Sequence, residues 1–415
     1  MWEALKTAFK LPDLRKKILW TLLLLAIFRI GSYIVVPGMR PFDFGENNLF
    51  SLLDIFSGGA LSNMSLFALG VNPYITASII MTLLTMVIPR LEELSKEGAE
   101  GRKVISKYTR YGTVLLGLIQ ASALTVAFRG AMVDPDSTWS YISIVVTMTA
   151  GTVLLMWLGE VLSEKGIGNG ISMIIFGGIV ARLLPNAIST LRNIGPGGFT
   201  IPGLIASLVI SVIVVFFVVI VTQGERKIPV QYAKRVVGRK MYGGQATHLP
   251  LRVNQAGVIP IIFASSVLAF PLTIRGFLAP DSGFAKFLDL FAPGRWLYLV
   301  LYALFIFIFT YFYTAISFNP MEVSNNMKKY GGFIPGIRPG KPTAEYLDKI
   351  LTRVTLAGAL FLVFISLLPY LITPFTKVQV GLTGTSLLIA VGVAIDTMKQ
   401  IEAHLLMRQY EGFLK

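Results

Sequence analysis

The chain has 415 residues, of which 54% are hydrophobic and only 14% are charged, and its formal net charge is +15. Soluble domains average about 25% charged residues, so this composition excludes a set of soluble domains and indicates an integral membrane protein. The chain has no cysteine, which excludes disulfides and thiol nucleophiles. It has only two histidines, His248 and His404, which argues against a histidine-rich metal site.

Ten apolar segments are predicted to cross the membrane, because each comes near the roughly 20 residues that a transmembrane helix needs. The fifth and the seventh are short and rich in glycine or proline. In chain order the predicted spans are Ile18–Val36, Leu66–Ile88, Tyr111–Phe128, Tyr141–Leu158, Ile171–Leu184, Ile201–Val221, Ala256–Phe270, Trp296–Phe318, Val354–Ile372 and Val378–Ile395.

The basic residues indicate the orientation, because lysine and arginine accumulate in cytoplasmic loops. Counted over ten spans, most of the 37 basic residues fall on the side of the N-terminus, so both termini are expected to be cytoplasmic. Residues 1–17 are amphipathic and basic and are predicted to form an interfacial helix, and residues 396–415 a short cytoplasmic tail. Arg29 is the one charge expected deep within a span, where it is interpreted as a structural residue.

A repeated motif relates the two halves of the chain, residues 18–200 and 201–395. The second and seventh spans share the pattern G-V-x-P-x-I-x-A-S, at Gly70–Ser78 and Gly257–Ser265. Because each half holds five spans, the two halves must run in opposite senses across the membrane. The predicted fold is therefore an all-α integral membrane protein with ten transmembrane helices in two inverted five-helix halves.

In inverted-repeat folds the working site lies at the midplane, where interrupted helices of the two halves face each other. The second, fifth, seventh and tenth spans offer only aliphatic side chains there. Such a ring would form a hydrophobic constriction that excludes water when it is narrow, although ordinary helix packing explains the same residues equally well. The predicted ring consists of Val71, Ile75, Ile171, Ile175, Ile262 and Ile389.

A short apolar segment at about residues 50–65 precedes the second span. It is too short to cross a bilayer and too apolar for a simple loop, and Gly58 and Gly59 allow it to bend. An apolar segment of this kind is predicted to re-enter and pack against protein, where it could plug the space under the ring. The alternative is an amphipathic helix on the surface.

Two long loops, residues 223–254 and 319–352, are predicted on the cytoplasmic side. The first is expected to contain a hairpin, with Ile228–Ala233 and His248–Val253 extended around a basic turn, and the second carries Arg338 at a tip rich in glycine and proline. The accumulation of basic residues in cytoplasmic loops explains the charge of both loops. It does not explain why their tips are partly apolar and constrained by glycine or proline. Docking of an anionic or acidic partner, such as RNA or an acidic protein groove, is favoured.

The spans hold little that could support chemistry or ion coupling. Asp54, Glu160 and Asp396 lie at the edges of spans, and no Asp or Glu lies clearly inside one. Secondary transporters usually place ionisable groups there, so a passive channel is favoured and a solute transporter stays as the alternative. A membrane-bound enzyme would need a nucleophile–base pair or a ligand cluster. No catalytic residues, metal ligands or cofactors are predicted.

Several long segments resemble the SecY family of protein-conducting channels, and the resemblance runs from FRIGSYIVVPG near Phe28 to the final helix. The chain departs from the usual family pattern at Val71, where isoleucine is common, and at Leu382-Thr383. The matching segments are FSGGALSNMSLFALGVNPYITASII, KEGAEGRKVISKYTRYGT, WLGEVLSEKGIGNGISMIIF, THLPLRVNQAGVIP, FNPMEVSNNMKKYGGFIPGIRPGKPTAEY and GLTGTSLLIAVGV.

The resemblance implies an hourglass channel in the inner membrane with the six ring residues given above. It implies a lateral gate between spans two–three and seven–eight, with Thr76, Gln120 and Asn254 as polar candidates. It implies partner docking through Arg235, Arg239, Lys240 and Arg338, and it implies as partners SecE, SecG, the SecA motor, the ribosome, and unfolded secretory and membrane proteins. Anionic lipid is a further expected partner, because a net charge of +15 on so apolar a chain suggests basic loops that face an anionic surface. The implied plug comprises Phe56, Ser57, Gly58, Gly59, Ala60, Leu61, Ser62, Asn63 and Met64.

Overall fold

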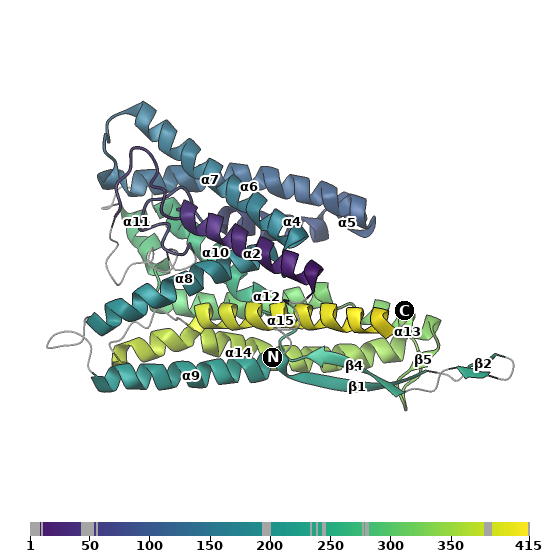
Figure 1. The fold of residues 1–415 in the computed structure, drawn as a ribbon. Helices are drawn as coiled ribbons and strands as arrows, with labels where there is room; N and C mark the ends of the chain where they lie inside the picture. Colours follow the sequence, from purple (N-terminus) through teal and green to yellow (C-terminus); the bar gives the residue numbers. More distant parts are fainter. Residues whose placement is uncertain are drawn as a thin grey trace.

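The computed structural model describes residues 9, 11–42, 54, 57–192, 201–232, 235–237, 240–242, 246–275, 278, 282–376 and 384–413. Figure 1 shows two groups of long helices side by side, the first from the N-terminal part of the chain and the second from the C-terminal part. Helices α8 and α10 lie between the groups, and the strands project from one end of the molecule.

The first half is mainly helical. Pro12, Pro73 and Pro89 each stand at the first or second position of a helix, where proline's missing N–H costs no hydrogen bond. The helices are α2 (Pro12–Gly31), α4 (Asn72–Val87), α5 (Pro89–Lys96), α6 (Ala99–Ala127), α7 (Thr138–Lys165) and α8 (Gly170–Arg192), with a short 3₁₀ turn at Arg129–Ala131.

The second half is also mainly helical. Its longest helix, α14, has 36 residues and begins well before the predicted ninth span. The helices are α9 (Ile201–Gln223), α10 (Ile259–Arg275), α11 (Gly283–Leu288), α12 (Trp296–Ser317), α13 (Pro320–Lys329), α14 (Lys341–Thr376) and α15 (Gly384–Phe413), with a 3₁₀ turn, η2, at Asp289–Phe291.

Each of the ten predicted spans overlaps a helix, but several boundaries were wrong. The second span was expected from Leu66, whereas α4 begins at Asn72 because Gly70 takes a left-handed conformation (φ +58°) that ends the preceding turns. The first span was expected to reach Val36, but α2 ends at Gly31. The fifth was expected to end at Leu184, but α8 continues to Arg192 with Pro185 inside the helix.

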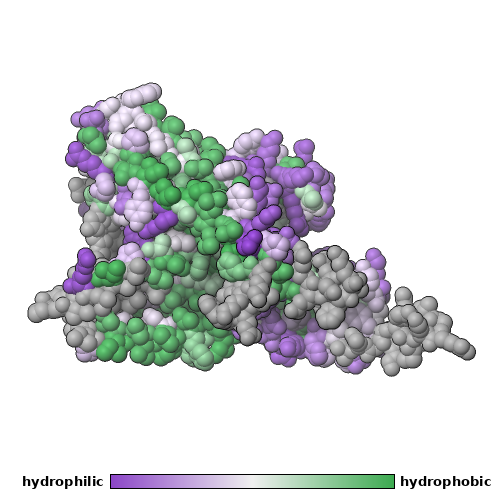
Figure 2. Space-filling view, viewed as in Figure 1, coloured by the Kyte–Doolittle hydropathy of each residue, from purple (hydrophilic) through white to green (hydrophobic). Residues whose placement is uncertain are grey.

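The surface has the apolar belt of a membrane protein. Figure 2 shows hydrophobic residues across the middle of the visible face and hydrophilic residues gathered toward its ends. Within the described residues, four helices are long and apolar enough to cross a membrane, or five if the α4–α5 pair, bent by 102°, counts as one broken span. The chain is thus an α-helical membrane protein with several spans, and the count of ten stays a prediction.

The two large loops form one folded unit, which we call the sheet subdomain. Strands β1 (Glu225–Tyr232) and β4 (Ala246–Arg252) pair antiparallel, which confirms the predicted hairpin. Strand β5 (Gly332–Phe333), from the second loop, joins the outer edge of β1, and a separate ribbon is formed by β2 (Arg235–Val237) and β3 (Lys240–Tyr242). The buried side chains that join this sheet to α13 and α14 are Ile228, Val230, Leu251, Met327, Ile334, Leu347 and Ile350.

Tight packing at Gly151 gives a first prediction. A Cβ atom on this residue of α7 would clash with the backbone carbonyl oxygen of Leu66, which cannot rotate away. Gly151→Ala is therefore expected to cost about 2 kcal/mol of stability through overpacking and to lower the melting temperature of the purified protein. Gly130→Ala is the matched control, because no atom lies within 4 Å of the added methyl group. Equal melting temperatures for the two variants would contradict this account.

Candidate functional site

A small apolar cavity lies where helices of the two halves meet. It is lined by five of the six predicted ring residues, Val71, Ile75, Ile175, Ile262 and Ile389, and by Ser57, Gly70, Asn72 and Ser265. The space open to the centre of a water molecule is about 20 Å³, which is room for roughly one water. Helices α4, α8, α10 and α15 thus close around an apolar point in this structure.

The internal repeat explains why Ile75 and Ile262 meet there. Gly70 and Gly257 both take a left-handed conformation, at φ +58° and +63°, two residues before α4 and α10 begin. Pro73 and Pro260 then occupy the first turn of each helix. The same motif therefore starts both helices at the cavity, and its isoleucine points into the cavity from each half.

Ile171 does not line the cavity. It lies at the start of α8, where a Cβ atom on Gly159 would clash with its Cδ1 atom, so its side chain packs against α7. It remains in the same apolar cluster as Ile75 and Ile175, one turn away from the cavity wall. The sequence pattern placed Ile171 and Ile175 on one face of a helix, but neighbouring helices determine which of the two faces the cavity.

The predicted plug packs tightly inside the first half. Ala60, Leu61 and Met64 are at most 2% exposed, and they lie in turns rather than in a surface helix. Ser57 reaches the cavity, and a Cβ atom on Gly58 would lie 2.8 Å from the Cα atom of Gly178 in α8. The segment therefore lies directly against the cavity, as the sequence predicts. Phe56 lies outside the described residues.

Charged side chains surround the plug, and the sequence did not predict this. Asp54 was expected at the edge of a span and Arg182 outside the membrane. Instead, Arg182 lies within α8 and forms an ion pair with the buried carboxylate of Asp54. Arg29, interpreted from the sequence as a structural residue, donates a hydrogen bond of 2.6 Å to the carbonyl oxygen of Gly58. The only signal for Arg182 in the sequence was its position near the end of the predicted fifth span, Ile171–Leu184.

A seam between the halves runs along α4 and α10, which are in contact, and α6 also touches α10. Thr76, on α4, donates its hydroxyl to the carbonyl oxygen of Asn72 in its own helix, and the hydrogen bonds of the described residues include none between Thr76 and Asn254. Asn254 is 5% exposed, and its Oδ1 atom has no hydrogen-bond partner among the described atoms. Gln120 is half-buried on α6.

The predicted docking residues belong to the sheet subdomain. Arg235 and Lys240 are in the paired strands β2 and β3, and Arg239 lies outside the described residues. Arg338 is exposed at the tip of the second loop. Its carbonyl oxygen accepts a 2.9 Å hydrogen bond from Thr343, and the carbonyl oxygen of Gly340 accepts one of 2.6 Å from Ser324. The Arg338 tip is therefore held in a defined shape.

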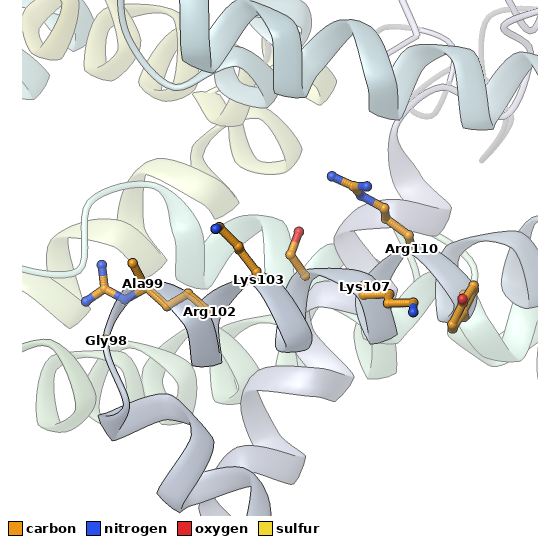
Figure 3. Close-up of a pocket in the computed structure, with 8 residues that line it drawn as sticks. Gly98, Ala99, Arg102, Lys103, Lys107 and Arg110 are labelled. Carbon is orange, nitrogen blue, oxygen red and sulfur yellow. The ribbon is translucent and has the colours of Figure 1, made fainter.

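A basic cavity near the first turns of α6 was not singled out in the sequence, where its residues served only the topology argument. It is wide and open, with a volume of about 970 Å³. Figure 3 shows Lys103 and Arg110 pointing from α6 toward the space between this helix and its neighbours. Arg110 also pairs with Glu160 of α7 at 2.9 Å. The basic residues that line the cavity are Arg102, Lys103, Lys107 and Arg110.

The fold and the site together define a membrane protein of two helical halves that meet at an apolar constriction. Residues 65–398 match the family model described as SecY. The Protein translocase subunit SecY of Thermotoga maritima is 47% identical, over 100% of this chain and 98% of that protein. The same subunit of Halalkalibacterium halodurans is also 47% identical, over 100% of both chains. The chain belongs to the SecY family, which confirms the resemblance seen in the sequence.

Solved structures share the fold. "The structure of a protein conducting channel" matches with a TM-score of 0.65 and 18% identity over 94% of this chain and 92% of that chain. Sec61 in the canine ribosome–channel complex from the endoplasmic reticulum matches with a TM-score of 0.61, also at 18% identity and over the same shares. At this level of identity the likeness establishes the fold.

Proposed function

We propose that this protein is the central channel subunit of the Sec translocon, which moves unfolded secretory proteins across the cytoplasmic membrane and releases hydrophobic segments sideways into lipid. One observation carries the proposal: the aliphatic cavity of about 20 Å³ between the two halves, with the plug segment against it. A constriction with no charged group on its wall has no counter-charge for an ion or a charged solute. It seals by excluding water and widens when the halves separate.

A sideways exit into lipid is expected because it is energetically favourable for an apolar segment of the transported polypeptide, which we call the client. A client segment of roughly 20 apolar residues gains free energy by leaving a wet pore for lipid. The seam between α4 and α10 is the path for this release, because it joins the two halves through side-chain packing. Ile79 of α4 and Phe263 of α10 belong to one apolar cluster, and the ring of Phe263 meets Phe309 of α12 edge-on at 5.8 Å. Packing of this kind can separate and re-form.

The sheet subdomain is the proposed docking site for the SecA motor or a translating ribosome, through Arg235, Arg239, Lys240 and Arg338. SecE is proposed to clamp the halves and SecG to bind at the periphery, with both termini in the cytoplasm. The basic cavity of Figure 3 suits anionic lipid headgroups. Basic residues of this kind attract both an anionic membrane surface and an acidic protein partner.

The direct test of the proposed function is transport by the purified complex. Proteoliposomes that contain this protein with SecE and SecG are expected to protect an unfolded, signal-bearing substrate from external protease when SecA and ATP are added. Protection should disappear when the signal is deleted. Equal protection with and without this subunit would refute the proposal, and uptake of a small solute by the subunit alone would favour the transporter alternative.

Charge reversal at the Arg338 tip gives a further prediction. Arg338→Glu is expected to reduce SecA-driven transport by roughly tenfold, because like charges then face an acidic partner at short range. Folding should be unaffected, since the side chain is exposed. Arg295→Glu is the matched control, because this exposed arginine stands before α12, on the side predicted to face outward. If both variants transport equally well, Arg338 contributes only to the orientation of the chain in the membrane and not to partner docking.

A further inference from the structure

Two arginines from different helices contact the plug segment, Arg29 through a hydrogen bond and Arg182 through an ion pair. We propose that Arg182 of α8 and Arg29 of α2 are positioning residues that hold the plug closed, with the Arg182–Asp54 ion pair as its principal latch. This inference rests on the proposed function, because it concerns how the channel is kept shut. The latch determines how readily an arriving polypeptide displaces the plug.

The latch is built around a buried carboxylate. The side chain of Asp54 is 3% exposed and that of Arg182 is 25% exposed, so the pair lies largely out of water. Within the plug, Asp54 Oδ1 accepts a 2.8 Å hydrogen bond from the backbone N–H of Ser62, and the Asp54 carbonyl oxygen accepts one of 2.9 Å from Gly59. Asp54 thus folds the plug onto itself and offers its second oxygen to α8.

Arg182 binds more than one part of the plug. Besides Asp54, its Nη2 atom donates a 3.0 Å hydrogen bond to the Ser62 hydroxyl. Its guanidinium also lies close to Gly59, where a Cβ atom would approach Nε at 3.1 Å. Gly59 has φ +92°, so a side chain there would be strained and would also press on the arginine. The plug backbone is therefore shaped to admit the guanidinium.

Arg29 of α2 makes the second contact with the plug segment. Its Nη1 atom donates to the carbonyl oxygen of Gly58, and its Nη2 atom donates to the hydroxyl of Tyr33, both at 2.6 Å. The guanidinium also lies 4.6 Å from the centre of the Tyr33 ring. Tyr33 fixes the direction of Arg29, and the planar guanidinium joins α2 to the plug.

Removal of Arg182 alone and removal of both charged partners should affect the plug to different degrees, a difference that apolar packing alone would not produce. When Arg182 is removed, the buried Asp54 carboxylate loses its counter-charge, which is costly in a site of low dielectric constant. When both charges are removed, no uncompensated charge remains, and the cost is smaller. Loss of Arg182 alone should therefore loosen the plug more than loss of both partners.

The experiment measures plug exposure and the membrane seal separately. Ala60 of the plug is fully buried and the chain has no native cysteine, so Ala60→Cys gives a single labelling site. In the complex with SecE and SecG in nanodiscs, the rate of labelling by a hydrophilic maleimide reports plug opening. Arg182→Met is expected to raise this rate by roughly tenfold or more. Asp54→Asn with Arg182→Met should bring it back toward the parent, and Arg182→Lys should stay close to the parent.

Arg192→Met is the matched control, because it removes the same charge from the end of the same helix. Chloride flux through proteoliposomes, measured on the same variants, reports the seal. Equal labelling rates in the parent and in Arg182→Met, or an equal increase in Arg192→Met, would overturn the latch. Faster labelling without added flux would support the latch but refute the plug as the seal. If Arg182→Met does not fold, the Arg182→Lys and double variants decide by the same comparison.

Discussion

A short crosslink between α4 and α10 is expected to stop both export and membrane insertion. Cysteines at Thr76 and Ser265 place one partner on each side of the seam, since Ser265 lines the cavity beside Ile75, the neighbour of Thr76. A short linker fixes the two halves at their closed separation, where the cavity has room for about one water and no polypeptide can pass. Export should fall to background, and a long flexible linker should restore it.

The control crosslink lies within one half. A Cβ atom on Gly117 of α6 would lie 3.4 Å from Cγ2 of Thr149 in α7, so cysteines at these positions can be joined without bridging the seam. Transport should survive this crosslink. The absence of native cysteine makes both experiments simple to interpret. Normal transport with the α4–α10 crosslink fully formed would show that the seam is not a gate.

Polar substitution in the cavity is expected to open the constriction. Asparagine in place of Ile75 or Ile262 brings an amide into an apolar site, where burial without a hydrogen bond costs roughly 1–3 kcal/mol. The closed state is destabilised by this amount, whereas the hydrated open state is not. Ion leakage should rise by roughly tenfold, and substrates with weak signals should be exported better. Flux assays and export assays on the same variants measure the two effects.

Comparison of Ile175 with Ile171 sharpens this test. The two residues lie one turn apart on α8, but only Ile175 lines the cavity in this structure. Ile175→Asn should leak more than Ile171→Asn if the closed cavity alone forms the seal. Equal leakage would indicate that all six residues of the predicted ring act together. Leakage unchanged in every cavity variant would remove the constriction from the mechanism.

The sequence by itself determined the class, the family and the main chemistry of the site. Composition indicated a membrane protein because a lipid-facing chain must be apolar over most of its length. The repeat at Gly70 and Gly257 located the two helices that meet at the cavity, since glycine and proline act on the local backbone and need no distant partner. The same local rules placed Ile75 and Ile262 on those helices, and two extended segments around a basic turn predicted the β1–β4 hairpin.

Only the tertiary structure decided which of these residues touch each other. The sequence pattern does not distinguish Ile171 from Ile175. In the structure the side chain of Ile171 packs against Gly159 of α7 and does not line the cavity. The two basic loops join into one sheet because β5 pairs with β1, a contact between residues about 100 positions apart. Asp54 and Arg182 are 128 residues apart, and no local pattern predicts their ion pair. Charges tolerate burial only beside a partner, and folding alone brings that partner near.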